Sequence, residues 1–167
     1  MDRRRCCLGT ALALGLAASR AGATGPLKHL PAPGSALQLP DVPLLEGGEF
    51  KAASEQGRVV VLYWWASWCP FCALVTPSIQ KLWRTQRERG LLVLGLSVDQ
   101  DLAAARAYRA KRGHDFPSGW LTPAVEAVLP KPQGLPVTVV RGRDGRVAAA
   151  ETGQLFPEDV ELLARFL

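Results

Sequence analysis

Cys69 and Cys72 are separated by two residues in the stretch YWWASWCPFCALVTP, which covers residues 63–77. Two thiols at this spacing can form a small structural cross-link, supply half of a zinc site, or act as a reactive dithiol that exchanges disulfide bonds. The choice among these depends on the elements that hold the pair and on the compartment in which the chain works.

The segments on either side of the pair are predicted to be a strand and a helix. RVVVLYWW, residues 58–65, is a continuous β-branched and aromatic run, typical of a strand buried on both faces of a sheet. From Cys69 to about Glu88 the apolar residues recur at helical spacing, and Gly90 ends the pattern. The residues that give this spacing are Leu74, Ile79, Leu82 and Trp83.

A strand-to-helix junction gives the two cysteines different roles. Cys69 is expected to cap the helix, Pro70 to take the first helical position, and Cys72 to lie one turn along on the same face. Their Cα atoms would then lie about 5 to 6 Å apart, which a disulfide accepts, but so short a loop gains little stability from the bond. The positive end of the helix dipole favours a Cys69 thiolate, and Cys72 can resolve a mixed disulfide. The position therefore suits a reactive dithiol better than a cross-link.

Metal and peroxide chemistry fit these residues less well. A zinc site needs two more ligands, and outside the N-terminal leader the chain has no second cysteine pair, while His29 and His114 are single and far apart in sequence. A peroxide-reducing cysteine calls for a threonine three residues earlier, where this chain has Ala66. We therefore predict no metal site and no bound cofactor.

The first 23 residues, MDRRRCCLGTALALGLAASRAGA, predict an export signal. Three arginines precede an apolar run at about residues 8–18, and small residues lead to a cleavage site after Ala23. The run has about half the length that a membrane-spanning helix needs, so an uncleaved anchor is the weaker interpretation. Both the twin-arginine and the ordinary secretory route are compatible with this leader. We expect a periplasmic protein, in an oxidising compartment where a dithiol stays reduced only if something reduces it.

One domain is predicted after the leader at residues 1–23. Residues 24–34 are rich in proline and glycine and are expected to form a flexible lead-in, and residues 35–167 form the domain. The formal charge of +5 comes mostly from the leader. Arginines cluster between residues 84 and 89, but an acidic residue interrupts them and no aromatic pattern accompanies them. A solvated helix face is therefore favoured over nucleic-acid binding.

The order of strands and helices along the domain predicts an α/β fold. A second buried strand at residues 91–99 and a helix at residues 100–113 follow the first pair, which implies parallel strands with a right-handed crossover. We expect a mixed central sheet with helices on both faces, antiparallel at its C-terminal edge. The other expected elements are an N-terminal hairpin at 35–54 with a Gly47-Gly48 turn, a short helix at 123–129, two strands within 134–151 joined at Arg143-Asp144-Gly145, and a C-terminal helix from Pro157.

Three motifs occur together: WASWCPFC with Pro77 five residues after Cys72, LSVDQD at the end of the second buried strand and the turn after it, and GLPVTVV, whose Gly-x-Pro-x-Thr leads into a late strand. In combination they resemble the thioredoxin fold, and most closely the TlpA/ResA type of periplasmic disulfide reductase. The resemblance covers roughly residues 35–167. It implies a thioredoxin-like fold in which Cys69 is the attacking thiol, Cys72 the resolving thiol, and Pro136 a cis-proline that faces them.

The residues around the pair are expected to bind the substrate. Trp68 abuts the cysteine at the strand end, where it can shield the thiol and offer an apolar contact. A cis peptide bond at Leu135-Pro136 would expose backbone groups that can pair with an extended substrate segment. The expected substrate-binding residues are Trp68, Pro70, Phe71, Leu135 and Pro136.

Two positions depart from the pattern of the family that the chain resembles. Thioredoxins usually bury an aspartate where this chain has Tyr63, and several of the periplasmic reductases carry a glutamate where it has Val75. A carboxylate there is thought to manage the proton of the resolving thiol, so proton transfer from Cys72 must use water, Tyr63 or another group. The Pro70-Phe71 pair also differs from the usual pairs, which leaves the redox poise open.

The residues and the resemblance together imply an exported thiol-disulfide oxidoreductase that reduces disulfides of periplasmic client proteins. Its expected partners are client disulfides and a membrane dithiol that supplies electrons; no nucleic acid is expected, and the protein is expected to be a monomer. Three alternatives stay open. They are a disulfide oxidase on the same fold, a copper-delivery or metal-binding module, for which a CxxxC spacing is more usual, and a noncatalytic interaction domain with a vestigial pair.

Overall fold

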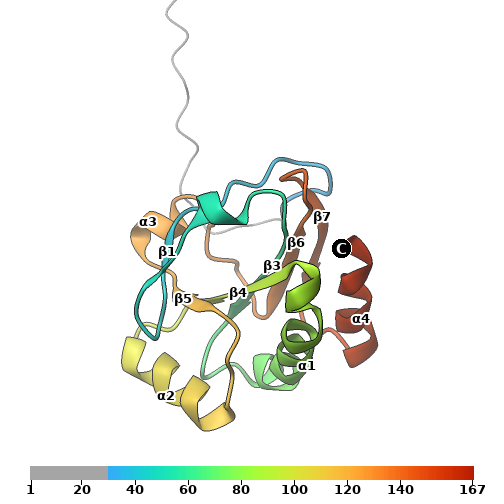
Figure 1. Ribbon diagram of the computed structural model, residues 1–167. Helices are drawn as coiled ribbons and strands as arrows, with labels where there is room; N and C mark the ends of the chain where they lie inside the picture. The colour runs from blue at the N-terminus through green and yellow to red at the C-terminus, as the bar shows by residue number, and fades with distance from the viewer. Residues whose placement is uncertain (1–29) are drawn as a thin grey trace, which may run out of the picture.

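The computed structural model describes residues 30–167. The predicted export signal, most of the predicted lead-in and His29 lie outside the described residues. A five-stranded sheet in the order β5-β4-β3-β6-β7 forms the centre of the molecule, and a two-stranded hairpin, β1-β2, lies beside it (Figure 1). The strands are β1 (Val42–Pro43), β2 (Glu49–Phe50), β3 (Val59–Trp65), β4 (Leu91–Ser97), β5 (Ser118–Trp120), β6 (Val137–Arg141) and β7 (Val147–Thr152).

The middle of the sheet consists of β3 and β4, which pair in parallel with Trp65 opposite Ser97. Every residue of these two strands is buried, as expected for β-branched and aliphatic runs covered on both faces. On the other side of β3 the strand β6 runs antiparallel, and β7 is antiparallel to β6. The prediction of a mixed sheet with an antiparallel C-terminal edge is confirmed.

The helices cover the two faces of the sheet unequally. In Figure 1, α1 and α2 lie below the sheet and α4 lies to its right, whereas the short α3 and the hairpin lie at the left, on the side of β5. Tyr63 and Trp65, two residues apart on β3, point to the same face, where Tyr63 bonds to α1 and Trp65 packs on Tyr108 of α2. The helices are α1 (Pro70–Gln86), α2 (Leu102–Arg112), α3 (Pro123–Glu126) and α4 (Pro157–Leu162), with 3₁₀ helices η1 (Ala52–Glu55), η2 (Arg87–Arg89) and η3 (Leu163–Phe166).

The edge strand β5 was not predicted from the sequence, and the predicted N-terminal hairpin covers it. The amide of Leu45 donates to the carbonyl of Ser118 at 2.8 Å, and Leu44 pairs with Gly119. A Cβ atom at Gly119 would overlap the side chain of Val42, so only glycine lets the hairpin approach this closely. The hairpin therefore caps this edge of the sheet and blocks further strand pairing there.

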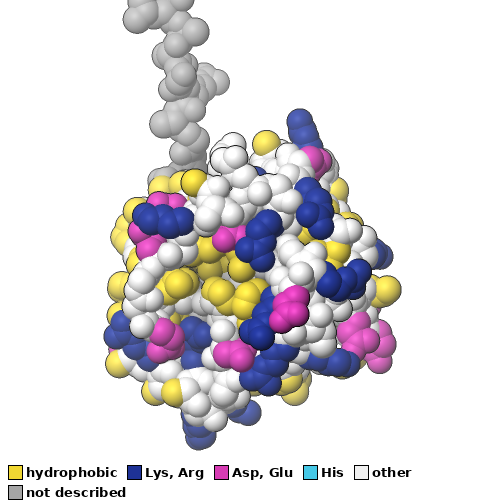
Figure 2. Space-filling view, in the orientation of Figure 1, with side chains coloured by type: hydrophobic (Ala, Val, Ile, Leu, Met, Phe, Trp, Pro, Cys, Tyr) yellow, Lys and Arg dark blue, Asp and Glu magenta, His cyan; other side chains and the backbone are white. Residues whose placement is uncertain are grey.

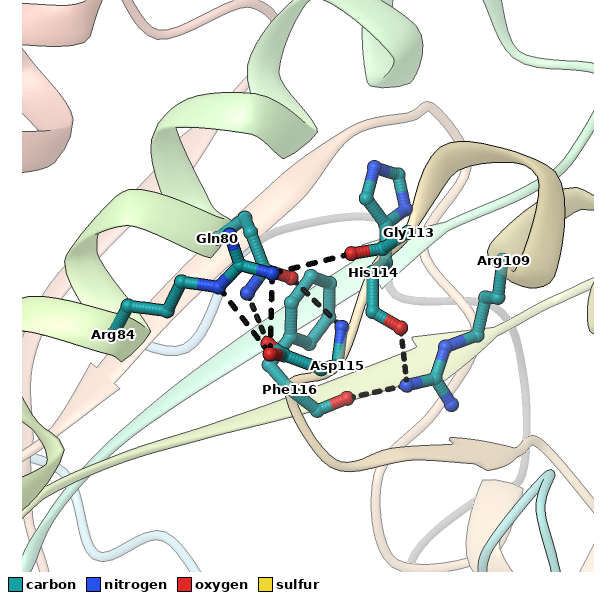
Figure 3. A network of polar contacts seen from close by, with 7 residues as sticks. All are labelled: Gln80, Arg84, Arg109, Gly113, His114, Asp115 and Phe116. Atoms are coloured by element: carbon teal, nitrogen blue, oxygen red, sulfur yellow. Dashed lines mark hydrogen bonds and ion pairs between the residues drawn. The ribbon is translucent and has the colours of Figure 1, made fainter.

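A polar network fastens the segment between α2 and β5 to α1 (Figure 3). The Arg84 guanidinium donates to Asp115 Oδ2 at 3.2 Å, and the Asp115 amide donates to Gln80 Oε1 at 2.9 Å. The buried Arg109 donates to the carbonyls of His114 at 3.2 Å and Phe116 at 2.7 Å. Burial, followed by the charge of Arg109, lowers the pKa of His114 to about 4.

The surface charge is mixed on the face shown in Figure 2. Lys and Arg side chains alternate with Asp and Glu side chains there, and apolar side chains lie exposed between them. None of the helices within residues 30–167 has the length and apolar character needed to cross a bilayer.

Candidate active site

The cysteine pair lies at the N-terminus of α1, as the sequence predicted. Cys69 is the N-cap residue, Pro70 occupies the first helical position, and a disulfide joins Cys69 to Cys72 with their Cα atoms 5.2 Å apart. The Cys72 amide donates to Cys69 Sγ at 3.1 Å. Cys69 is 3% exposed and Cys72 fully buried, so Cys69 is the more accessible sulfur but is far less exposed than a free helix end would be.

A tight turn at residues 66–69, here called the cysteine turn, connects β3 to α1. The Cys69 amide closes it by donating to the Ala66 carbonyl at 3.2 Å. Ser67, inside the turn, donates through its amide to both carboxylate oxygens of Asp99, at 3.1 and 3.0 Å, and through its hydroxyl to Oδ1 at 2.6 Å. The sequence prediction missed both residues. Asp99 lies in the LSVDQD motif, directly after a buried strand, and that position was the available signal.

Three exposed apolar side chains, here called the apolar rim, surround the start of α1. Trp68 is 65% exposed, Phe71 54% and Leu74 61%. Pro70 between them is also exposed. Leu74, one of the apolar residues that indicated the helix, lies off the buried face of α1, because it is five residues from Ile79, about 140° around the helix axis. Phe71 and Leu74, three residues apart, share one exposed face at the start of α1.

The Leu135-Pro136 peptide bond is cis. It directly precedes β6, where Val137 pairs with Trp64, so it lies at the end of the sheet from which the cysteine turn emerges. Pro136 is buried and Leu135 half-buried, and the Gly153 amide donates to the Pro136 carbonyl at 2.9 Å. The structure thus brings the five residues expected to bind substrate to the same end of the sheet as the two cysteines.

Behind Cys72, Tyr63 occupies the position at which the family resemblance leads us to expect a carboxylate. Its hydroxyl lies 3.0 Å from Thr76 Oγ1 and donates to the Cys72 carbonyl at 3.2 Å, while Thr76 Oγ1 donates to the same carbonyl at 2.6 Å. Burial raises the pKa of Tyr63 well above its ordinary value, so the phenol stays protonated and is no base at neutral pH. Val75 is buried and apolar. The sequence prediction did not include Thr76.

The described part of the chain offers no cluster of three or more His, Cys, Asp or Glu side chains that could hold a metal ion. His114, considered as a ligand from the sequence, is instead packed against Tyr108 and Phe116, with ring centroids 5.9 and 6.0 Å away.

Comparison with known proteins identifies relatives of this arrangement. A model of the AhpC/TSA family matches residues 31–150. The soluble secreted antigen MPT53 of Mycobacterium tuberculosis is 31% identical over 72 residues, which cover 43% of this chain and 40% of that protein. The thiol-disulfide oxidoreductase ResA of Geobacillus kaustophilus is 26% identical over 119 residues, which cover 70% of this chain and 67% of ResA. The match to MPT53 therefore spans less than half of that relative.

Solved structures show the same fold. A thioredoxin-family thiol:disulfide interchange protein from Chlorobium tepidum superposes with a TM-score of 0.74 at 22% identity, over 80% of this chain and 96% of that one. A secreted Mycobacterium tuberculosis disulfide oxidoreductase homologous to Escherichia coli DsbE gives a TM-score of 0.68 at 22% identity, over 78% and 97% of the two chains. The predicted thioredoxin-like fold is confirmed.

Proposed function

This chain belongs to the AhpC/TSA family, and from that premise we propose that it is an exported thiol-disulfide oxidoreductase that reduces disulfides of periplasmic client proteins. The observation that carries the proposal is the Cys72 amide that donates to Cys69 Sγ at the start of a 17-residue helix. A thiolate at that position gains a hydrogen bond and the positive end of the helix dipole. Cys69 is therefore the better nucleophile of the two.

The reaction consists of two thiol-disulfide exchanges. The Cys69 thiolate attacks one sulfur of a client disulfide, which forms a mixed disulfide and releases the other client sulfur as a thiolate. The Cys72 thiol then loses its proton, and its thiolate attacks Cys69 Sγ, which breaks the mixed disulfide. Two electrons pass to the client, both client sulfurs leave as thiols after protonation, and the Cys69–Cys72 disulfide of the present structure results. A dithiol donor outside the chain must return it to the reduced form.

Client binding uses the apolar rim and the extended backbone at Leu135-Pro136, directly before β6. Exposed aromatic and aliphatic side chains next to a reactive sulfur suit an unfolded or extended client segment, because such a segment offers both apolar side chains and free backbone groups. The rim lies outside the core, so its residues can contact a client without rearrangement of the fold.

Dithiothreitol-dependent reduction of insulin disulfides tests the proposed activity. We expect a rate above the dithiothreitol background in the wild type and no such increase in Cys69→Ser, while reduced Cys72→Ser mixed with insulin in the absence of dithiothreitol should accumulate a mixed disulfide after one exchange. Equal rates for Cys69→Ser and the wild type would refute the proposal.

Two exposed leucines provide a matched test of client binding. Leu74→Ser should raise KM for a peptide disulfide about three- to tenfold, since it removes exposed apolar contact area from the start of α1. Leu162 lies on α4 and is 55% exposed, close to the 61% of Leu74. Leu162→Ser should leave KM unchanged. Equal changes in the two variants would show that the rim does not bind the client.

A further inference from the structure

Asp99 is a buried carboxylate that the reaction described above does not use. It is 4% exposed, and within residues 30–167 no other Asp or Glu is buried to this degree. A carboxylate at such a site is tolerated only when hydrogen-bond donors surround it, and each donor is then held in a fixed position.

The donors come from three strand ends. Ser67, after β3, supplies its amide and its hydroxyl, and the Ser97 hydroxyl at the end of β4 donates to Asp99 Oδ2 at 2.7 Å. The Trp120 indole, at the end of β5, donates to the Asp99 carbonyl at 2.8 Å. The Asp99 carboxylate therefore ties the cysteine turn to the end of β4, and the Asp99 backbone carbonyl links this site to β5.

We propose that Asp99 is a positioning residue for Cys69, a step that rests on the proposed role of Cys69 as the attacking thiol. The carboxylate holds Ser67, the turn that contains Ser67 ends at Cys69, and the turn geometry directs Cys69 Sγ at the Cys72 amide. When that alignment is kept, the amide stabilises the Cys69 thiolate; when the turn loosens, part of this stabilisation is lost.

Charge and position predict opposite effects at this site. A negative carboxylate near a thiolate disfavours it, so removal of the charge alone would make Cys69 more reactive at neutral pH. Loss of the turn geometry would make it less reactive. Whether Asp99→Asn makes Cys69 less or more reactive at neutral pH therefore distinguishes positioning from simple electrostatic repulsion.

The other charged groups near the turn provide the control. Asp99 borders an open groove of about 350 Å³, which Trp68, Asp101 and Lys131 also line. The Asp101 carboxylate accepts from the Ala103 amide at 2.8 Å as the cap of α2. Asp101→Asn keeps a good capping side chain and removes one negative charge from the same groove, without a bond to the cysteine turn. Tyr63, behind Cys72, stays neutral.

The test measures how fast iodoacetamide modifies Cys69 as a function of pH in the reduced full chain. A Cys72→Ala background leaves the amide of residue 72 in place and removes the second thiol of the pair, and peptide mapping isolates the Cys69 signal. Asp99→Asn, Ser67→Ala, their combination and Asp101→Asn are compared, with thermal unfolding of each to confirm that it folds.

Positioning predicts that Asp99→Asn lowers the rate at pH 7 about three- to tenfold and moves the ionisation midpoint of Cys69 to higher pH. Ser67→Ala should act in the same direction, the double variant should lose less than the product of the two single losses, and Asp101→Asn should match the parent. An unchanged or faster Asp99→Asn, or fully multiplicative losses, would overturn the proposal. If Asp99→Asn does not fold, an unchanged rate in Ser67→Ala overturns it alone.

The alkylation rate needs no client protein, so it separates this inference from the proposed function. Failure of the wild type to reduce insulin would refute the proposed activity. The effect of Asp99 on the ionisation of Cys69 would still be measured by the alkylation rate.

Discussion

Acid should destabilise this protein through His114 as the pH falls from 6.5 toward 4. The imidazole is half-buried between Tyr108 and Phe116, with the guanidinium of Arg109 nearby (Figure 3). Burial, and then the positive charge of Arg109, lowers its pKa from 6.5 to about 4. Between these two pH values the unfolded chain binds a proton that the folded chain does not, so the stabilisation present above pH 6.5 is lost as the pH falls toward 4.

The size of the effect follows from the pKa difference. A fully enclosed imidazole with this shift would lose about 3 kcal/mol across the window. Because the His114 ring keeps some contact with water, solvent screening reduces the expected loss to about 1 to 2 kcal/mol. Partial burial by itself would raise the pKa of Asp115, but hydrogen bonds from Gln80 and Arg84 outweigh it and lower this pKa below 3.8. Protonation of Asp115 in the folded protein therefore affects stability only at lower pH.

Urea unfolding at pH 7.5 and pH 4.5 measures this loss. His114→Phe retains an aromatic ring for the packing and removes the titrating group, so its free energy of unfolding should change less over the same interval. The difference between wild type and variant cancels every other group, including His29. An equal fall in both proteins would show that His114 does not cause the loss of stability.

Three further changes should alter stability in graded amounts, each measured by urea unfolding. Tyr63→Phe should cost about 1 kcal/mol and leave the neutral part of the pH-rate profile unchanged, because the phenol is neutral there; loss of a titration near pH 7 would contradict this. Val75→Glu should cost several kcal/mol, since it buries a carboxyl group without partners, and a cost below that of Val75→Leu would argue against burial. Gly119→Ala should cost about 1 to 3 kcal/mol through overlap with Val42, whereas Gly134→Ala, which has open space, should be nearly neutral.

The sequence predicted those elements whose own residues determine them. β3 and β4 are long runs of β-branched and aliphatic residues, α1 has a capping cysteine and a proline in its first turn, and Gly90 ends the 3₁₀ helix η2 that follows α1. These signals lie in residues that are neighbours in sequence, so they can be recognised without knowledge of the tertiary contacts. The hairpin turn at Gly47-Gly48 and the Asp-Gly turn between β6 and β7 were found for the same reason.

β5 was missed because its three residues, Ser118 to Trp120, carry no strand pattern of their own. The segment is a strand because β4 pairs with it on one side and the hairpin covers the other. Such an element depends on tertiary contacts that a periodicity argument does not contain.

The candidate site was predicted where the residues are neighbours in sequence and missed where they are not. Cys69, Cys72, Trp68 and Phe71 lie within one short motif. Asp99 is 32 residues from Ser67, and the two meet because the register of the parallel strands places Trp65 opposite Ser97. The sequence showed an acidic residue after a buried strand but not which turn it would hold.

The central claim is that Cys69 attacks and Cys72 resolves. To test these roles, each reduced variant in which one cysteine of the pair is replaced by serine is mixed with a peptide that contains one disulfide, and the mixed disulfides are mapped by mass spectrometry. Cys72→Ser should form a stable adduct at Cys69 within the reaction time, and Cys69→Ser should form little or none at Cys72, which is fully buried. A faster adduct at Cys72 than at Cys69 would contradict the account.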